Sequence, residues 1–345
     1  MILGDLGADV VKVERPERGD DTRGWGPPFD ERGQSAYYLS INRNKLSVAA
    51  DLRSQRDRAL ILSLSRTADV VVENFLPDTL ERLGISADEA LRASSTLIWC
   101  TITGFGSKSR RPGYDFVVQA ESGWMSITGE PEGQPMKHGV ALADIIAGKD
   151  AATAILAALV GRSRGVSIER KIDISLIESA RAALVNVAQN SIVSRAGARR
   201  WGNAHANLVP YQLFEAKDRP IVIAVGNDDQ WQACAAALGL SELGNDSALS
   251  SNAGRLAQRE RIVRALTDRL AQRTAEQWVL ALDAAHVPCG VVKSVMEAID
   301  EAATVSPVTG MPSSVGGTVR FPPPALDEHG AAIRERGWEA FRVTG

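Results

Sequence analysis

An aspartate within an otherwise small and apolar segment is the residue of this sequence best placed to do chemistry. Asp144 lies in GVALADIIAGKDAATAILAAL, residues Gly139–Leu159, where the other polar side chains are Lys149, Asp150 and Thr153. Burying a carboxylate costs free energy unless a partner satisfies it or a reaction uses it. Asp144 is therefore either a structural carboxylate or one held in place for a reaction.

Apolar residues recur after Asp144 with helical spacing, at Ile145, Ile146, Ala152, Ile155, Leu156 and Leu159. This pattern predicts that Asp144 lies at, or just before, the N-terminus of a helix. Aspartate is among the best N-cap residues, because its oxygens accept the free N–H groups of the first helical turn. Position alone therefore favours a cap, and only the neighbouring groups can favour a reactive carboxylate.

Strands and helices alternate in the first half of the sequence, which predicts a parallel, doubly wound, Rossmann-like α/β domain. The expected strands are Ala8–Val13, Leu46–Asp51, Asp69–Glu73, Leu97–Thr103 and Ser167–Ile174. The expected helices are Ser54–Thr67, Thr79–Leu83, Ala87–Ala93, the helix after Asp144, and Leu176–Arg195. The first residues read as the end of a helix that leads into a strand, so we expect an element that would precede them to be missing.

A polar loop, Arg195–Asn207, separates this part from a second unit with a different pattern. Tyr211–Phe214 and Pro220–Val225 predict antiparallel strands. Helices are expected at Asp228–Leu238, Ala253–Gln272, Thr274–Ala285 and Val295–Ala302, with a short strand in Val287–Val292. The predicted domains are residues 1–195, a large α/β domain; 196–305, a smaller α+β domain; and 306–345, a return linker whose helix, Asp327–Arg336, packs on the large domain.

Composition excludes several classes of function. The 345 residues are 44% hydrophobic and carry a net charge of −3, which fits a globular protein and predicts no binding to nucleic acid or membrane. The three cysteines are isolated and the four histidines show no metal spacing, so we expect no metal site and a cytoplasmic location. No apolar run approaches the roughly 20 residues of a membrane span, and no phosphate-binding glycine motif or serine nucleophile elbow is present.

Two further pairs of residues could bind a ligand. Asn74 and Phe75 directly follow a predicted strand, where an amide and an aromatic ring suit a nucleotide-like head group, although a turn residue and a core residue would give the same pattern. His205 and Asn203 lie in the polar loop at the predicted domain junction, where ligand sites concentrate, although a surface histidine is the simpler interpretation.

Seven stretches in order along the chain resemble the family III CoA-transferases, a superfamily that includes formyl-CoA transferase, carnitine CoA-transferase and α-methylacyl-CoA racemase. They are LGDLGADVVKVERPERGDDTRGW (3–25), NRNKLSVAADLR (42–53), ADVVVENFLPDTLERLG (68–84), TGFGSKSRRPGYDFVVQAESG (103–123), ALADIIAGKDAATAILAAL (141–159), GNAHANLVPYQLF (202–214) and VPCGVV (287–292). The sixth stretch looks most like members that act on dicarboxylic acids, such as succinyl-CoA-dependent enzymes.

The resemblance implies an enzyme that moves CoA from an acyl-CoA to a small carboxylic acid, with no permanently bound cofactor. It implies Asp144 as the catalytic nucleophile, which forms an aspartyl anhydride and then an aspartyl thioester. It also implies an interlocked homodimer. From their place in the loop at the predicted domain junction, we expect substrate contacts at Asn203 and His205. The CoA contacts that it implies are Arg23, Ala50, Arg53, Asn74, Phe75, Leu76, Arg82, Tyr114 and Asp115.

Two alternatives remain open at this stage. Racemase members of the superfamily carry a catalytic histidine at the position of Tyr114, and a phenol is a poor proton shuttle near neutral pH, so this residue favours a transferase. The second alternative is an inactive relative that binds CoA, because the family's first strand and turn are not evident before Leu3.

Overall fold

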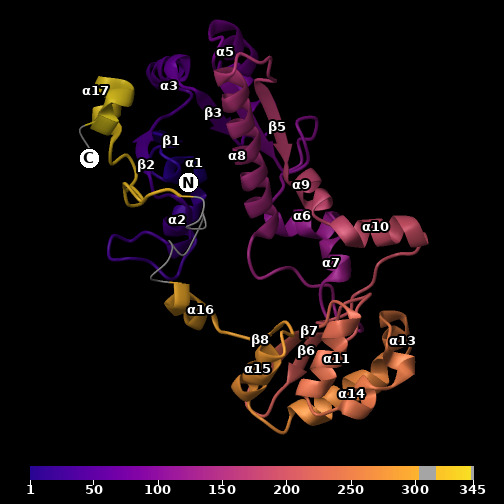
Figure 1. The fold of residues 1–345 in the computed structure, drawn as a ribbon. Helices are drawn as coiled ribbons and strands as arrows, with labels where there is room; N and C mark the ends of the chain where they lie inside the picture. Colours follow the sequence, from indigo (N-terminus) through magenta and orange to yellow (C-terminus); the bar gives the residue numbers. More distant parts are fainter. Residues whose placement is uncertain (303–315, 343–345) are drawn as a thin grey trace. The chain divides into compact units, whose positions relative to one another are not determined.

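The computed structural model describes residues 1–302 and 316–342, and the chain folds as two compact units (Figure 1). The larger unit comprises residues 1–124, 138–186 and 302–345, and the smaller comprises 125–137 and 187–301. The chain thus leaves the larger unit twice. The short excursion at 125–137 lies within the sequence predicted for the large domain, and the start of the predicted return linker, 306–315, lies outside the described residues.

Parallel strands form the framework of the larger unit, as the alternating pattern predicts. β1 (Val10–Glu14) pairs with β2 (Lys45–Ala49), and a second sheet has the order β3 (Val70–Glu73), β4 (Ile98–Thr103), β5 (Lys171–Ser175). The prediction of one doubly wound sheet is met only in part, because the five strands form two sheets. Among the described residues, β1 and β3 each have a neighbour on one side alone.

Helices cover these sheets and fill their cores with apolar side chains. Leu46 and Val48 of β2 pack with Leu64, Ile333 and Phe341. The helices of the larger unit are α1 (Ile2–Asp5), α2 (Ala36–Ile41), α3 (Gln55–Thr67), α4 (Thr79–Arg82), α5 (Ala87–Ala93), α6 (Asp115–Glu121), α8 (Leu142–Ser163), α9 (Leu176–Ala182) and α17 (Gly330–Arg336), with 3-10 turns η1 (Asp21–Gly24) and η4 (Gly337–Arg342).

Two predicted long helices are each broken. The helix expected over Leu176–Arg195 is α9 followed by α10 (Val185–Ser194), and Val185 at the junction has a φ of 39°, which a continuous right-handed helix does not allow. The helix expected over Ala253–Gln272 is α13 (Asn252–Ala257) followed by α14 (Arg259–Leu270), with Gln258 at a φ of −117° between them. Apolar periodicity does not register a break of one or two residues.

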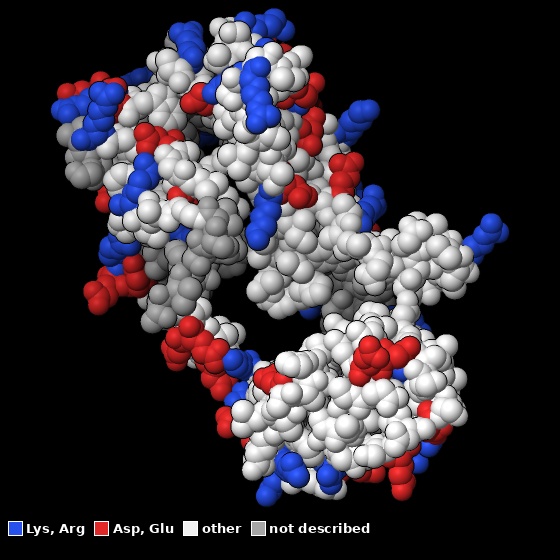
Figure 2. Space-filling model, viewed as in Figure 1, with Lys and Arg blue, Asp and Glu red and all other residues white. Residues whose placement is uncertain are grey.

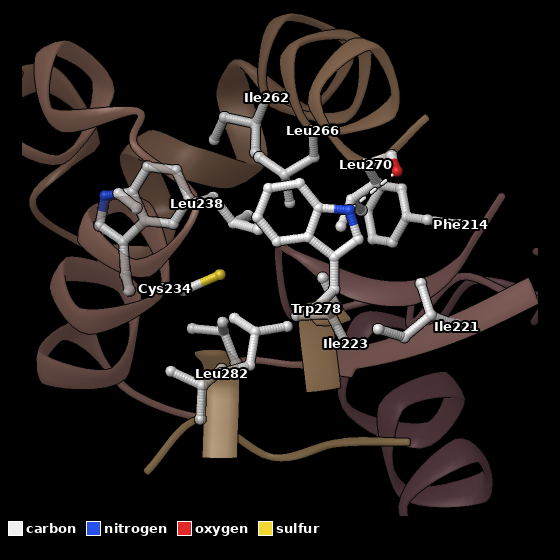
Figure 3. Packing of buried hydrophobic residues seen from close by; sticks show 14 of the residues in the cluster. Phe214, Ile221, Ile223, Cys234, Leu238, Ile262, Leu266, Leu270, Trp278 and Leu282 are labelled. Carbon is white, nitrogen blue, oxygen red and sulfur yellow. Dashed lines mark hydrogen bonds between the residues drawn. The ribbon is translucent and has the colours of Figure 1, made fainter. Parts of the chain in front are cut away.

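The smaller unit is an antiparallel sheet packed against helices, as predicted. β6 (Tyr211–Glu215) pairs with β7 (Pro220–Ala224), which pairs with β8 (Cys289–Val291). Its other elements are α11 (Asp228–Ala237), α12 (Ser241–Gly244), η2 (Ser247–Leu249), α13, α14, α15 (Ala275–Ala284) and α16 (Val295–Ala302), and α7 (Trp124–Ile127) and α10 start at the boundary between the units. Figure 3 shows the core between sheet and helices, where the Trp278 indole donates to the carbonyl oxygen of Leu270 at 2.9 Å.

Two surface properties bear on the prediction that the protein binds neither membrane nor nucleic acid. Among the described helices, none has both the length and the apolarity to cross a membrane. On the face in Figure 2, basic and acidic side chains are interspersed over both units, an arrangement that offers no single-sign field for a polyanion there.

Trp278→Ala should destabilise the smaller unit by about 3–5 kcal/mol, because it empties a fully buried indole site and removes a hydrogen bond. The measurement is urea denaturation followed by circular dichroism. Leu280→Ala on the same helix is the matched control, because Leu280 is 73% exposed, and it should cost less than about 0.5 kcal/mol. Equal losses in the two variants would contradict this placement of the core.

Candidate active site

Asp144 is the third residue of α8, a helix of 22 residues. The N-cap position is occupied by Ala141, and no side chain of the N-cap residue caps the helix. The Asp144 side chain is exposed to a cleft, and its carboxylate makes no hydrogen bond or ion pair with any described residue. The interpretation of Asp144 as a helix cap is therefore wrong, and its carboxylate has no structural role among the described residues.

A different aspartate caps this helix from outside. Oδ1 of Asp115, the first residue of α6, accepts the N–H of Ala143 at 2.8 Å. Its Oδ2 accepts from the Gln119 amide at 2.6 Å, and the amide oxygen of Gln119 accepts the N–H of His138 at 2.9 Å. This chain of bonds joins α6, the segment before α8 and the first turn of α8. It fixes the helix start that carries Asp144.

The surroundings of Asp144 shift the pKa of its carboxyl group. Burial against the cleft wall, followed by the negative charge of Asp115, raises the pKa of Asp144 to about 6. The side chain opens into the cleft and is accessible there, but surrounding protein still displaces much of its hydration shell. At neutral pH the carboxylate is therefore ionised but poorly stabilised, the state in which a carboxylate is most nucleophilic.

Two glycines set the distance between β4 and α6. A Cβ atom on Gly104 would lie 2.5 Å from the Cα of Gly113, and one on Gly113 would lie 2.6 Å from the Cα of Gly104. Neither backbone could give way by rotating a side chain, so both positions need glycine. This close approach of the two backbones brings Tyr114 and Asp115 directly beyond the carboxyl end of β4, the edge at which parallel sheets bind ligands.

A cleft of about 2120 Å³ in the larger unit collects most of the residues that the sequence selected. Pockets for drug-sized ligands measure roughly 300–1,000 Å³, so this cleft has room for a longer molecule. The predicted site residues that line it are Asp144, Ala50, Arg53, Asn74, Phe75, Leu76 and Tyr114.

Two aromatic side chains that the sequence analysis did not select, Trp25 and Tyr37, line the same cleft as Asp144. Tyr37 lines the cleft together with Asp144, and burial, followed by the negative charges of Asp144 and Asp115, raises the pKa of its phenol. Its ring meets that of Trp25 edge-on at 5.0 Å, and Trp25 meets Tyr114 at 6.3 Å. Nothing in the local sequence distinguishes Tyr37 from the buried Tyr38 next to it, so only the fold could identify it.

Three of the predicted CoA contacts, Arg23, Arg82 and Asp115, lie outside the lining of the cleft. All five N–H groups of Arg23 donate within the protein, to both carboxylate oxygens of Glu14, to the Tyr38 hydroxyl and to oxygens of Gln34 and Pro324, which leaves no donor for a phosphate. Arg82 is exposed on α4 and contacts its own turn. Asp115 holds α8, as described above. None of the three is among the residues that line the cleft.

The two predicted substrate residues lie in the smaller unit. His205 Nδ1 accepts the N–H of Asn207 at 3.0 Å, so the imidazole proton lies on Nε2 in the neutral form, and the ring packs at 5.0 Å from Tyr211. Asn203 is exposed two residues earlier. Both roles remain predictions.

Comparison with known proteins gives the family. The model of CoA-transferase family III matches residues 1–329. The chain is 38% identical over 351 residues to succinyl-CoA:glutarate CoA-transferase of Mus musculus, covering 95% of this chain and 80% of that protein. It is 40% identical over 305 residues to succinate–glutarate CoA-transferase of Agrobacterium fabrum, covering 86% and 76%. A crystal structure of a CaiB/BaiF family protein from Brucella suis superposes with a TM-score of 0.83 at 38% identity, over 97% of this chain and 93% of that one.

The fold is thus that of a mixed α/β protein with parallel sheets, shared with CaiB/BaiF proteins. The chain belongs to CoA-transferase family III, and the resemblance inferred from the seven sequence stretches is confirmed. It is an enzyme that transfers CoA between acyl-CoA thioesters and carboxylic acids.

Asp115→Asn should lower the pKa of Asp144 below about 6, because it removes a neighbouring negative charge while the amide oxygen can still accept the Ala143 N–H. The pKa should stay above the ordinary aspartate range, since burial is the larger cause. The measurement is a pH titration of carboxyl ¹³C shifts in Asp-labelled protein, with the Asp144 signal assigned by its loss in Asp144→Asn. Glu121→Gln, on the same helix, should leave the value unchanged. A pKa that rises in Asp115→Asn would refute the assignment.

Proposed function

We propose that Asp144 is the nucleophile of the CoA transfer. The observation that carries this proposal is an unpaired carboxylate with a raised pKa, fixed at the start of a long helix and exposed to a cleft large enough for CoA. Desolvation strengthens a carboxylate nucleophile and keeps water from the reactive acyl intermediate.

The proposed chemistry has four steps. An Asp144 oxygen attacks the thioester carbonyl carbon of the donor. The C–S bond then breaks, which gives a mixed anhydride and the CoA thiolate. The thiolate attacks the Asp144 carbonyl carbon, which releases the donor acid and forms an aspartyl-CoA thioester. The acceptor carboxylate displaces CoA to give a second anhydride. The thiolate then attacks the acyl carbon of the acceptor, releasing the new acyl-CoA and the Asp144 carboxylate.

The first turn of α8 has one donor to offer a developing oxyanion. The N–H of Leu142 donates to the carbonyl oxygen of Val140 and that of Ala143 to Asp115. Among the described residues no group accepts the N–H of Asp144, which lies at the positive end of the helix dipole. We assign this N–H, rather than the whole first turn, to oxyanion stabilisation.

We propose dicarboxylic acids as substrates, with succinyl-CoA as donor and an acid such as glutarate as acceptor. The relatives from Mus musculus and Agrobacterium fabrum are named for succinyl-CoA or succinate and glutarate, and a relative from Haloarcula hispanica is named for succinyl-CoA and mesaconate. We assign CoA binding to the cleft residues Ala50, Asn74, Phe75, Leu76, Tyr114 and Arg53, whose 82% exposed guanidinium could exchange Asp51 for a phosphate.

Asp144→Asn should abolish transfer, by at least about a thousandfold, while CoA still binds, since the amide keeps the shape and loses the nucleophile. Intact-protein mass spectrometry after mixing with succinyl-CoA should detect an acyl or CoA adduct on the unsubstituted enzyme only. The control is Asp150→Asn on the same helix, whose carboxylate instead accepts from the Ser179 hydroxyl at 2.7 Å. Near-normal turnover by Asp144→Asn would sink the nucleophile proposal, and exchange of an α-proton with deuterated solvent without any acceptor acid would favour a racemase.

We also propose a homodimer. The support comes from α10, a helix with no buried residue that carries several apolar side chains. Ile192 and Val193 on it are 69% and 74% exposed. Exposed apolar side chains on one element are typical of an interface, and a second copy of the chain is the occupant that the family resemblance implies.

The double variant Ile192→Glu, Val193→Glu should weaken or abolish this dimer, because it places charge on the proposed interface. Sedimentation velocity at micromolar concentration should give the mass of two chains for the unsubstituted protein and a lower mass for the variant. Leu280→Glu, which alters an equally exposed apolar residue on α15, should leave the mass unchanged. A monomeric unsubstituted protein would rule the proposal out.

A further inference from the structure

The part of α8 that lines the cleft carries, in order along the helix, a carboxylate, an apolar side chain, a glycine and a cation. These residues are Asp144, Ile145, Gly148 and Lys149, and α8 is the long helix of the larger unit in Figure 1. Residues four apart on a helix lie one turn apart on the same face. Gly148 therefore lies one turn beyond Asp144, and Lys149 lies one turn beyond Ile145.

Gly148 leaves open space one turn from the proposed nucleophile. A Cβ atom on Gly148 would meet no described atom of another part of the chain within 4 Å, whereas at Gly104 and Gly113 it would collide with a backbone. Glycine in a helix interior is also less stable than alanine. The missing side chain thus serves neither packing nor helix stability, and it keeps the wall of the cleft free beside Asp144.

Lys149 brings a positive charge to the same wall. The residue is exposed, and its ammonium group makes no hydrogen bond or ion pair with any described residue. Long side chains on a helix lean toward its N-terminus, so the stem of Lys149 leans toward the turn that holds Asp144. Five residues of α-helix rise only about 7.5 Å along the axis, and the flexible four-carbon stem of a lysine can span part of that distance.

The other lysine and arginine side chains that line the cleft are already engaged. Lys45 donates to the amide oxygen of Asn42 at 2.8 Å, and burial lowers its pKa to about 8. The rest form ion pairs, Lys12 with Asp20, Arg15 with Asp21, Arg53 with Asp51 and Arg111 with Glu121. An anion that enters the cleft thus meets in Lys149 a cation that has no partner to give up within the described part of the chain.

We propose that Gly148 and Lys149 form the part of the site that holds the transferred acid. The choice of a dicarboxylic acid rests on the proposed function. The methylene chain of the acid lies over Gly148 and against Ile145, and the Lys149 ammonium group binds the carboxylate that does not react. In every step of the proposed reaction the acid is joined to CoA or to Asp144 at one end only. Its other carboxylate stays charged throughout, so one cation serves donor and acceptor alike.

Lys149→Met tests the cation, because it keeps the length of the stem and removes the charge. In calorimetric titrations the unsubstituted protein should bind glutarate at least about tenfold more tightly than butyrate, which lacks the second carboxylate. Lys149→Met should lose this preference and Lys149→Arg should keep it. Arg164→Met, at the exposed C-cap of α8 and outside the lining of the cleft, is the matched control and should bind glutarate as before. A preference that persists in Lys149→Met, or that is absent from the unsubstituted protein, would overturn the proposal.

Gly148→Leu tests the open space, because it fills that space with a side chain that favours a helix and should leave the fold intact. With succinyl-CoA as donor, KM for glutarate should rise at least about tenfold. The Kd for CoA, measured by calorimetry, should be unchanged in Gly148→Leu and in Lys149→Met. Weaker CoA binding with an unchanged KM for glutarate would assign both residues to CoA and overturn the proposal.

The same measurements separate this proposal from the proposed function. If Asp144→Asn removes transfer and Lys149→Met leaves KM for glutarate unchanged, the acid site fails while the nucleophile stands. If the unsubstituted protein transfers no acid, the proposed function fails, and the titrations with glutarate and butyrate still decide the acid site.

Discussion

The candidate site depends on one hydrogen bond, from the N–H of Ala143 to the carboxylate of Asp115. It joins α6 and α8 through two residues that are 28 positions apart in the sequence, and it fixes the first turn of α8. If Asp144 itself capped the helix, its carboxylate would be engaged by a backbone N–H and would not be available for the proposed reaction. Because Asp115 provides the acceptor from α6, the carboxylate of Asp144, in the first turn of α8, is left without a partner among the described residues.

The same arrangement divides roles between two carboxylates. Asp115 accepts two hydrogen bonds, whereas Asp144 accepts none from the described residues, and burial together with the charge of Asp115 raises the pKa of Asp144 to about 6. Environment, rather than residue type, thus makes one aspartate structural and leaves the other available for the proposed nucleophilic role. Gly104 and Gly113 contribute indirectly, since their backbone contact determines where α6 begins.

Local patterns predicted the elements well, because periodicity and strand-end chemistry are short-range properties. The strands, α5 and the position of Asn74 and Phe75 at the cleft followed from the sequence. What it could not give depends on contacts across the chain. The sequence could not reveal that the guanidinium of Arg23 donates to Glu14, Tyr38 and Gln34, or that Asp115 reaches α8. Nor could it reveal that Tyr37 lines the cleft while Tyr38 is buried. The separation into two sheets is likewise a matter of long-range pairing.

The charges around the cleft also bear on how it would receive an acid. Asp144 lines the cleft, and its negative charge repels an incoming carboxylate. Lys12, Arg53 and Arg111 also line the cleft, but each is paired with a carboxylate, of Asp20, Asp51 and Glu121 respectively. Lys149, on α8 with Asp144, lines the cleft without a carboxylate partner among the described residues. The attraction that offsets the repulsion by Asp144 must therefore come from such an unpaired cation or from a paired one that exchanges its partner for the acid.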